Sequence, residues 1–132
     1  MRGSCLCGDV KFGVTEPLEH LRYCHCESCK KLSGSIGTAN ARVPAEAIRI
    51  VAGEELIRTY EPKEGSSKTF CSVCGSNLFG GGWPDSPVVS VRLSALDDAF
   101  EQRPEAHIFV RSVAAWETIP DDGLDRFDVR AP

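Results

Sequence analysis

The sequence has no long apolar segment and no excess of positive charge. No run of apolar residues approaches the roughly 20 that a membrane-spanning helix needs. Residues 1–5 (MRGSC) do not form the apolar region of a secretion signal. With 15 basic and 19 acidic residues, the net charge is -4, and there is no basic stripe of the kind that binds nucleic-acid phosphates. We therefore expect a cytoplasmic protein that neither spans a membrane nor binds nucleic acid.

Internal repeats and low-complexity segments are also absent. The length of 132 residues is typical of one domain, so we assign residues 1–132 to a single unit. Apolar residues occur in short, often alternating segments between turn residues, which is typical of a mostly β domain. We expect strands at 10–14, 20–24, 36–43, 48–50, 56–60, 68–70, 78–79, 88–93 and 107–110, a helical turn at 28–32, and an extended acidic tail from residue 120.

Cysteine is the most informative residue type. The seven cysteines form three tight clusters: Cys5 and Cys7, then Cys24, Cys26 and Cys29, then Cys71 and Cys74. An odd number of cysteines in a reducing compartment favours metal binding over disulfides. The last cluster, CSVCG, has the form of a zinc knuckle, in which Gly75 permits a backbone shape that other residues resist. Because a knuckle supplies only two sulfurs, a second pair must come from another cluster.

Two pairings of the cysteines would give the knuckle site its four sulfurs. Cys5 and Cys7 can complete the knuckle site, which leaves Cys24, Cys26 and Cys29 as a separate group of three. Alternatively, Cys26 and Cys29 complete it and the other three cysteines remain. We prefer the first pairing because it keeps every local cluster intact. Four thiolates close a tetrahedral zinc site, whereas three leave one position open for chemistry.

Zinc is the metal that this set of ligands favours. Soft thiolates also suit copper(I) and iron–sulfur clusters, of which the iron–sulfur cluster is the main rival. The segment His25-Cys26-Glu27 matches the H-x-E element of zinc deaminases, but the Pro that this signature requires before its last cysteine pair is replaced by Phe70. A deaminase is therefore disfavoured. His25 lies between two cysteines, so we expect its ring to point away from the ion, at the surface or as a support for the ligands.

The cysteine-containing runs resemble the glutathione-dependent formaldehyde-activating enzyme (Gfa) family, also called the centromere-protein-V domain family. The resemblance rests on residues 3–8 (GSCLCG), 23–31 (YCHCESCKK) and 70–75 (FCSVCG). It continues through residues 91–98 (VRLSALDD), residues 104–110 (PEAHIFV) and Trp116. The match therefore extends over nearly the whole chain, and the order of the three cysteine clusters is specific.

The resemblance implies a β-tent fold of antiparallel sheets with zinc knuckles. It implies a structural zinc on Cys5, Cys7, Cys71 and Cys74, and a catalytic zinc with a replaceable ligand on Cys24, Cys26 and Cys29. Two Zn²⁺ ions per chain are thus expected. The implied activity is that of a carbon–sulfur lyase similar to S-(hydroxymethyl)glutathione synthase, which joins glutathione, the expected small-molecule thiol partner, to formaldehyde.

Several residues outside the clusters are candidates for substrate contacts. Glutathione carries two carboxylates, so we consider Lys30 and Lys31, where the family commonly has arginines, and Arg42. Trp83, after three glycines, is interpreted either as part of a flap over the site or as a loop anchor. His107 alternates with apolar residues, and we interpret it as a core or supporting histidine rather than an acid–base group.

A second functional class is a zinc-stabilised binding module without catalytic turnover. The group of three cysteines favours the enzyme, because a scaffold does not need a metal with an open position. Two zinc ions per chain would favour the enzyme, and a single zinc ion would permit the binding module.

Overall fold

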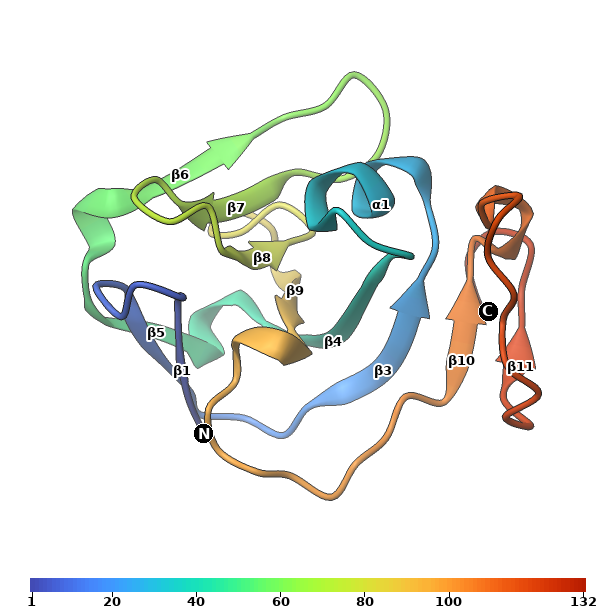
Figure 1. The fold of residues 1–132 in the computed structure, drawn as a ribbon. Helices are drawn as coiled ribbons and strands as arrows, with labels where there is room; N and C mark the ends of the chain where they lie inside the picture. Colours follow the sequence, from blue (N-terminus) through green and yellow to red (C-terminus); the bar gives the residue numbers. More distant parts are fainter.

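The computed structural model covers residues 1–132 and contains two β-sheets, one α-helix and four short 3-10 helices (Figure 1). The smaller sheet has the strand order β1 (Arg2–Ser4), β2 (Lys11–Val14) and β5 (Ile48–Ala52). The larger sheet has the order β11 (Asp125–Arg126), β10 (Ala106–Ile108), β3 (Glu19–Cys24), β4 (Thr38–Pro44), β9 (Val88–Arg92), β8 (Asn77–Gly80), β7 (Lys68–Cys71) and β6 (Ile57–Tyr60). The helices are α1 (Glu27–Ser33), η1 (Ala45–Ala47), η2 (Glu54–Leu56), η3 (Leu93–Ala95) and η4 (Val110–Ser112). The mostly β architecture is confirmed.

One edge of the larger sheet differs in direction from the rest. Strand β10 pairs in parallel with β3 and also with β11, whereas the other pairings are antiparallel. Parallel neighbours need a long connection. Residues 25–105 join β3 to β10, and the last part of this connection, between η3 and β10, crosses the base of the molecule (Figure 1). The tail expected to be merely extended therefore contributes strand β11 to this edge.

The hydrophobic core lies between the two sheets. Val10, Phe12 and Val14 are all buried, as their alternation predicts, and they point from the β2 segment toward the larger sheet. The Phe12 ring meets the Phe79 ring of β8 edge to face, with centroids 4.9 Å apart. Val91 of β9 is also fully buried in this cluster. This packing fixes the N-terminal hairpin against the middle of the larger sheet.

The cysteines lie on the turns where these strands end. β3 ends at Cys24, and α1 begins after Cys26, whose Sγ caps the helix by accepting a hydrogen bond from the Cys29 N–H (3.4 Å). β7 ends at Cys71, and the following turn returns through Gly75, whose positive φ of 77° suits glycine. Backbone hydrogen bonds from Gly75 N to Cys71 O (2.8 Å) and from Cys71 N to Ser76 O (3.0 Å) close this turn.

The C-terminal segment is held beside the first of these turns. Ile108 is in register with Cys24, and the His25 N–H donates to Ile108 O (3.1 Å). Beyond β10, Phe109 N donates to Val129 O (2.8 Å), so the end of the chain also pairs with this edge. Figure 1 shows β11 and the C-terminus alongside β10 at the outer edge. None of the helices is both long and apolar enough to cross a membrane.

The sheet packing predicts a sharp difference between two glycines of paired strands. In Gly3→Ala, the new Cβ would collide with the Phe12 ring and lie 2.7 Å from Ala95 O, so we expect a loss of stability of about 1–3 kcal/mol. In Gly13→Ala, the nearest atom would be Met1 O at 3.8 Å, an ordinary contact. Urea denaturation of both variants measures the difference. Equal midpoints for the two variants would contradict this account of the core.

Candidate metal centres and the adjoining cavity

The first cysteine cluster joins the two sheets. The Sγ atoms of Cys5, Cys7, Cys71 and Cys74 all lie within 4.8 Å of one another. Two of the separations are 3.5 Å (Cys5 to Cys7) and 4.0 Å (Cys7 to Cys71). Four sulfurs arranged tetrahedrally about a zinc ion with Zn–S bonds of about 2.3 Å would be about 3.8 Å apart. The cluster therefore has the ligand number, chemistry and spacing of a closed four-thiolate metal site.

Neighbouring donors support these sulfurs as thiolates. The Val10 N–H donates to Cys5 Sγ (3.3 Å). The Ser76 hydroxyl accepts from the Leu6 N–H (2.7 Å) and lies 3.3 Å from Cys74 Sγ, to which it donates its own proton. Hydrogen bonds from the Ser76 hydroxyl and the Ser76 N–H lower the pKa of Cys74 to about 5. These contacts favour the charged form of sulfur that a metal requires.

The second cluster is formed by Cys24, Cys26 and Cys29, whose Sγ atoms also lie within 4.8 Å of one another. Hydrogen bonds from Cys24 and then Cys29 hold the pKa of Cys26 far below its ordinary value. The same contacts, with Cys26 first, raise the pKa of Cys24. Three crowded sulfurs thus cannot all ionise without a neighbouring cation, and a bound metal ion fits that need.

The structure therefore agrees with the first of the two pairings, in which Cys5 and Cys7 complete the site of the Cys71 and Cys74 knuckle. Cys26 and Cys29 belong to the group of three and not to the knuckle of Cys71 and Cys74. All seven cysteines are free thiols, so no disulfide competes with either group.

His25 and His107 are buried and form a hydrogen-bonded chain with Asp122. His25 Nδ1 donates to Ile36 O (3.2 Å), so neutral His25 accepts at Nε2 from His107 Nδ1 (2.9 Å). His107 Nε2 then donates to Asp122 Oδ2 (2.7 Å). These three hydrogen bonds need three protons and two neutral imidazoles carry two, so the third proton lies between His107 Nε2 and Asp122 Oδ2.

The pKa directions agree with this assignment. Burial lowers the pKa of His25, which favours its neutral form. The hydrogen bond from His107 lowers the pKa of Asp122, which favours the carboxylate. His25 is thus a buried support for the cysteine turn rather than a surface residue, and His107 has the supporting position expected for it. The chain connects the turn between Cys24 and Cys26 to the C-terminal segment.

A cavity of about 720 Å³ opens beside Cys24, Cys26 and Cys29, within the size range of small-molecule sites. Cationic side chains outnumber acidic ones in its lining. Seven lysines and arginines line it (Arg22, Lys31, Arg42, Lys68, Arg92, Arg111 and Arg130), against two glutamates (Glu27 and Glu64). Such a lining favours an anionic ligand.

The two lysines proposed as glutathione contacts have different positions. Lys31 lines the cavity. Lys30 does not: its ammonium group donates to Glu27 Oε1 (2.9 Å) and to Ser112 O (2.5 Å), and its side chain is only 13% exposed. Lys30 therefore holds α1 against η4, and the structure offers no cavity position for it. Arg42, considered on sequence grounds, does line the cavity.

Sequence reasoning missed the two most buried cations of this lining. Lys68 and Arg92 are 3% and 4% exposed. Lysine and arginine on short strands normally point to solvent, so the sequence carries no signal that marks these two. It likewise gave no reason to place Arg111 and Arg130 at the same cavity.

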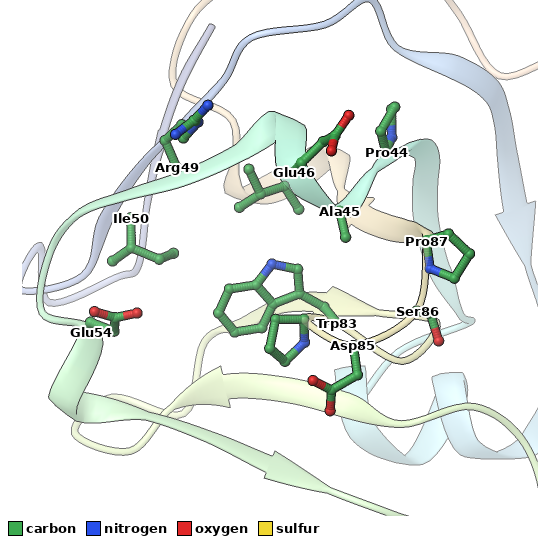
Figure 2. Close-up of a pocket in the computed structure, with 12 residues that line it drawn as sticks. Pro44, Ala45, Glu46, Arg49, Ile50, Glu54, Trp83, Asp85, Ser86 and Pro87 are labelled. Carbon is green, nitrogen blue, oxygen red and sulfur yellow. The ribbon is translucent and has the colours of Figure 1, made fainter.

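Trp83 lies at a different cavity, of about 620 Å³, which contains no cysteine. Figure 2 shows its indole in the middle of this second cavity, below Glu46 and above Asp85. The indole also packs on Phe79, with ring centroids 4.9 Å apart. Trp83 is therefore a loop anchor, and its interpretation as a flap over the cysteines is wrong.

The comparisons with known proteins agree with this geometry. Residues 1–112 match the family described as glutathione-dependent formaldehyde-activating enzyme. The chain belongs to this family. A relative from Halomonas elongata with the same family description is 31% identical, and the alignment covers 96% of this chain and 85% of the relative. A relative from Phaeosphaeria nodorum is 27% identical over 97% of this chain and 76% of its own length.

A solved structure supports the fold of this member of the Gfa family. The crystal structure of a Rhodobacter sphaeroides protein superposes with a TM-score of 0.62 and 21% identity, covering 96% of this chain and 99% of the other. At this level of identity, the likeness concerns the fold alone.

Removing one sulfur from each cluster tests their different roles. Cys71→Ser breaks the cluster that joins the sheets, so we expect a large fall in melting temperature and the loss of one metal ion per chain. Cys26→Ser should also lose one metal ion but retain most of the melting temperature, because its cluster lies on one local turn. Metal analysis and thermal melts of the purified variants measure both. A Cys71→Ser protein that melts like the wild type would rule out a structural metal there.

The buried histidine chain gives a separate prediction. His107→Asn removes both ring hydrogen bonds and leaves His25 Nε2 unpaired in the interior, so we expect a loss of about 1–3 kcal/mol in the free energy of unfolding. The control is His20→Asn, since the His20 side chain is 54% exposed. Chemical denaturation compares the two. Similar stabilities would show that the chain contributes nothing to the fold.

Proposed function

We propose that this protein is a cytoplasmic, zinc-dependent carbon–sulfur lyase of the S-(hydroxymethyl)glutathione synthase type, with two Zn²⁺ ions per chain. The observation that carries this proposal is the position of Cys24, Cys26 and Cys29 at a cavity lined by seven cations. An incomplete ligand set beside an anion-binding cavity fits a reaction between a small anionic thiol and an aldehyde. Membership of the Gfa family supports the same substrates.

In the proposed reaction, the glutathione sulfur attacks the carbon of formaldehyde and a carbon–sulfur bond forms. The electron pair of the carbonyl π bond moves to oxygen, which receives the proton that the thiol loses. The product is S-(hydroxymethyl)glutathione, and the reverse reaction breaks the same bond. Cys24, Cys26 and Cys29 would hold the zinc ion, which would supply Lewis acidity for this reaction.

The role of the chain is to bind and orient the tripeptide. Four of the cavity cations are exposed and have no ion-pair partner in the protein, so they are free for the two glutathione carboxylates: Lys31, Arg42, Arg111 and Arg130. The Arg130 guanidinium is placed over the Phe109 ring, 5.7 Å from its centroid. Arginine is suited to bind the glutathione carboxylates because its planar guanidinium group can form two hydrogen bonds with one carboxylate. Holding the thiol close to the aldehyde supplies the proximity term of catalysis.

The test is a rate measurement, because glutathione and formaldehyde also combine without a catalyst. Exchange NMR follows the interconversion of glutathione and its formaldehyde adduct with and without protein. We expect the zinc-loaded wild type to raise the exchange rate and Cys26→Ser to abolish the increase. If the loaded protein binds glutathione but leaves the exchange rate unchanged, it is a binding module without turnover.

Substrate binding is tested on the cavity arginines. We expect Arg42→Gln and Arg111→Gln each to raise KM for glutathione about tenfold, with a smaller change in kcat, because each removes a cation from the cavity. Arg58→Gln is the matched control, since Arg58 is an exposed arginine of β6 that donates to Glu55 O outside the cavity. An unchanged KM in both cavity variants would contradict the proposed carboxylate contacts.

A further inference from the structure

Two cations are buried beside the three cysteines without any acidic partner. Lys68 is 3% exposed, and its one hydrogen-bond partner is Cys29 Sγ, 3.6 Å from its Nζ. Arg92 is 4% exposed; its Nη1 donates to Asn40 Oδ1, while its Nε and Nη2 have no partner. Neither side chain forms an ion pair with a carboxylate. Burying an unpaired charge is costly, so an anion must offset these two.

The backbone makes room for this arrangement. Gly80 of β8 is in register with Lys68 of β7, and a Cβ at residue 80 would lie 2.9 Å from Arg92 Nη2. The absence of a side chain there lets the guanidinium group of β9 occupy the space. The cysteine sulfurs line the same cavity as both cations, and the two glutamates of that lining, Glu27 and Glu64, form no ion pair with either cation.

Counting charges shows what the site lacks. Three thiolates and one divalent metal ion sum to -1, since metal binding requires the deprotonated sulfurs. The fixed positive charges of Lys68 and Arg92 change that sum to +1. The loaded site is therefore one negative charge short, and a monoanion in the open metal position makes it neutral. With a neutral ligand, the net positive charge of the buried site stays uncompensated.

We propose that Lys68 and Arg92 are positioning residues whose charges make the metal-loaded Cys24–Cys26–Cys29 site select a monoanionic ligand over a neutral one. This inference rests on the proposed function only in that a divalent metal occupies the three cysteines. It deepens that function, because the two cations then favour the substrate thiol as its thiolate. It does not depend on which aldehyde reacts.

Cobalt(II) in place of zinc gives the readout. Its visible absorption changes when a ligand enters an open position, and the closed four-thiolate site does not respond. Azide, a monoanion, and imidazole, which is mostly neutral at pH 8, are titrated separately into the cobalt-loaded protein. The measured quantity is the ratio of the imidazole Kd to the azide Kd, which reports charge preference apart from turnover.

We expect Lys68→Gln and Arg92→Gln each to lower this ratio about tenfold or more, because each removes a buried charge from the wall of the same cavity, where the dielectric constant is low. Lys68→Arg, which keeps the charge, should retain most of the ratio. Lys31→Gln is the control: it removes an exposed cation of the same cavity, and solvent screening should keep the ratio within about twofold.

The inference is overturned by an unchanged ratio in the Lys68→Gln and Arg92→Gln proteins, or by an equal fall of the ratio in Lys31→Gln. If Lys68→Gln does not fold, Lys68→Met and Arg92→Gln measure the same loss of charge. A loss of the preference in Lys68→Arg would show that shape and not charge matters, and would also overturn it. A wild type with the preference but no glutathione–formaldehyde exchange refutes the proposed reaction and leaves this inference standing.

Discussion

The meeting of four sulfurs from two distant segments is the constraint on which the rest of the structure depends. Cys7 and Cys71 are separated by 64 positions in the chain, yet their sulfurs lie 4.0 Å apart. They meet because the N-terminal hairpin packs through Phe12 on Phe79, beside the turn that carries Cys71. A chain of this size buries a small core, so a metal ion that joins both sheets would add stability that packing alone supplies only in part.

The two clusters differ in their surroundings more than in their sulfurs. Around the group of four, local hydroxyl and backbone N–H groups such as Ser76 and Val10 N–H support the thiolates. Around the group of three, the Cys29 N–H and the Ser28 hydroxyl lie beside Cys26 Sγ, and charge adds to this support: Lys68 contacts Cys29, and Arg92 shares the cavity wall. Neutral donors alone suit a metal site in which the protein supplies all four ligands. Fixed cations suit a site that exchanges an anionic ligand, because their attraction remains after one ligand leaves.

Neighbouring residues of the short helix serve different purposes. Successive residues of an α-helix point about 100° apart, and here Lys30 and Lys31 have different surroundings. Lys31 lines the cavity, and Lys30 instead ties the helix to Ser112 near the C-terminal edge. The buried chain from His25 through His107 to Asp122 makes a second connection to that edge. The C-terminal segment thus acts on the cysteine turn through two sets of contacts, although it contains no cysteine.

The sequence by itself determined the family, the mostly β architecture and the three local cysteine clusters, because these depend on local spacing and on alternation along single strands. Which two clusters meet depends on how the sheets pack, so the structure decided it. Tertiary structure alone decided that the tail adds a strand to a parallel edge, that Trp83 lies at a second cavity, and that Arg111 and Arg130 line the cavity beside the cysteines. It also decided the burial of Lys68 and Arg92. Whether a cation on a strand faces solvent or a cluster of sulfurs depends on which residues the neighbouring strands bring beside it. The role of Gly80, which leaves space for the Arg92 guanidinium group, is visible only in the folded structure.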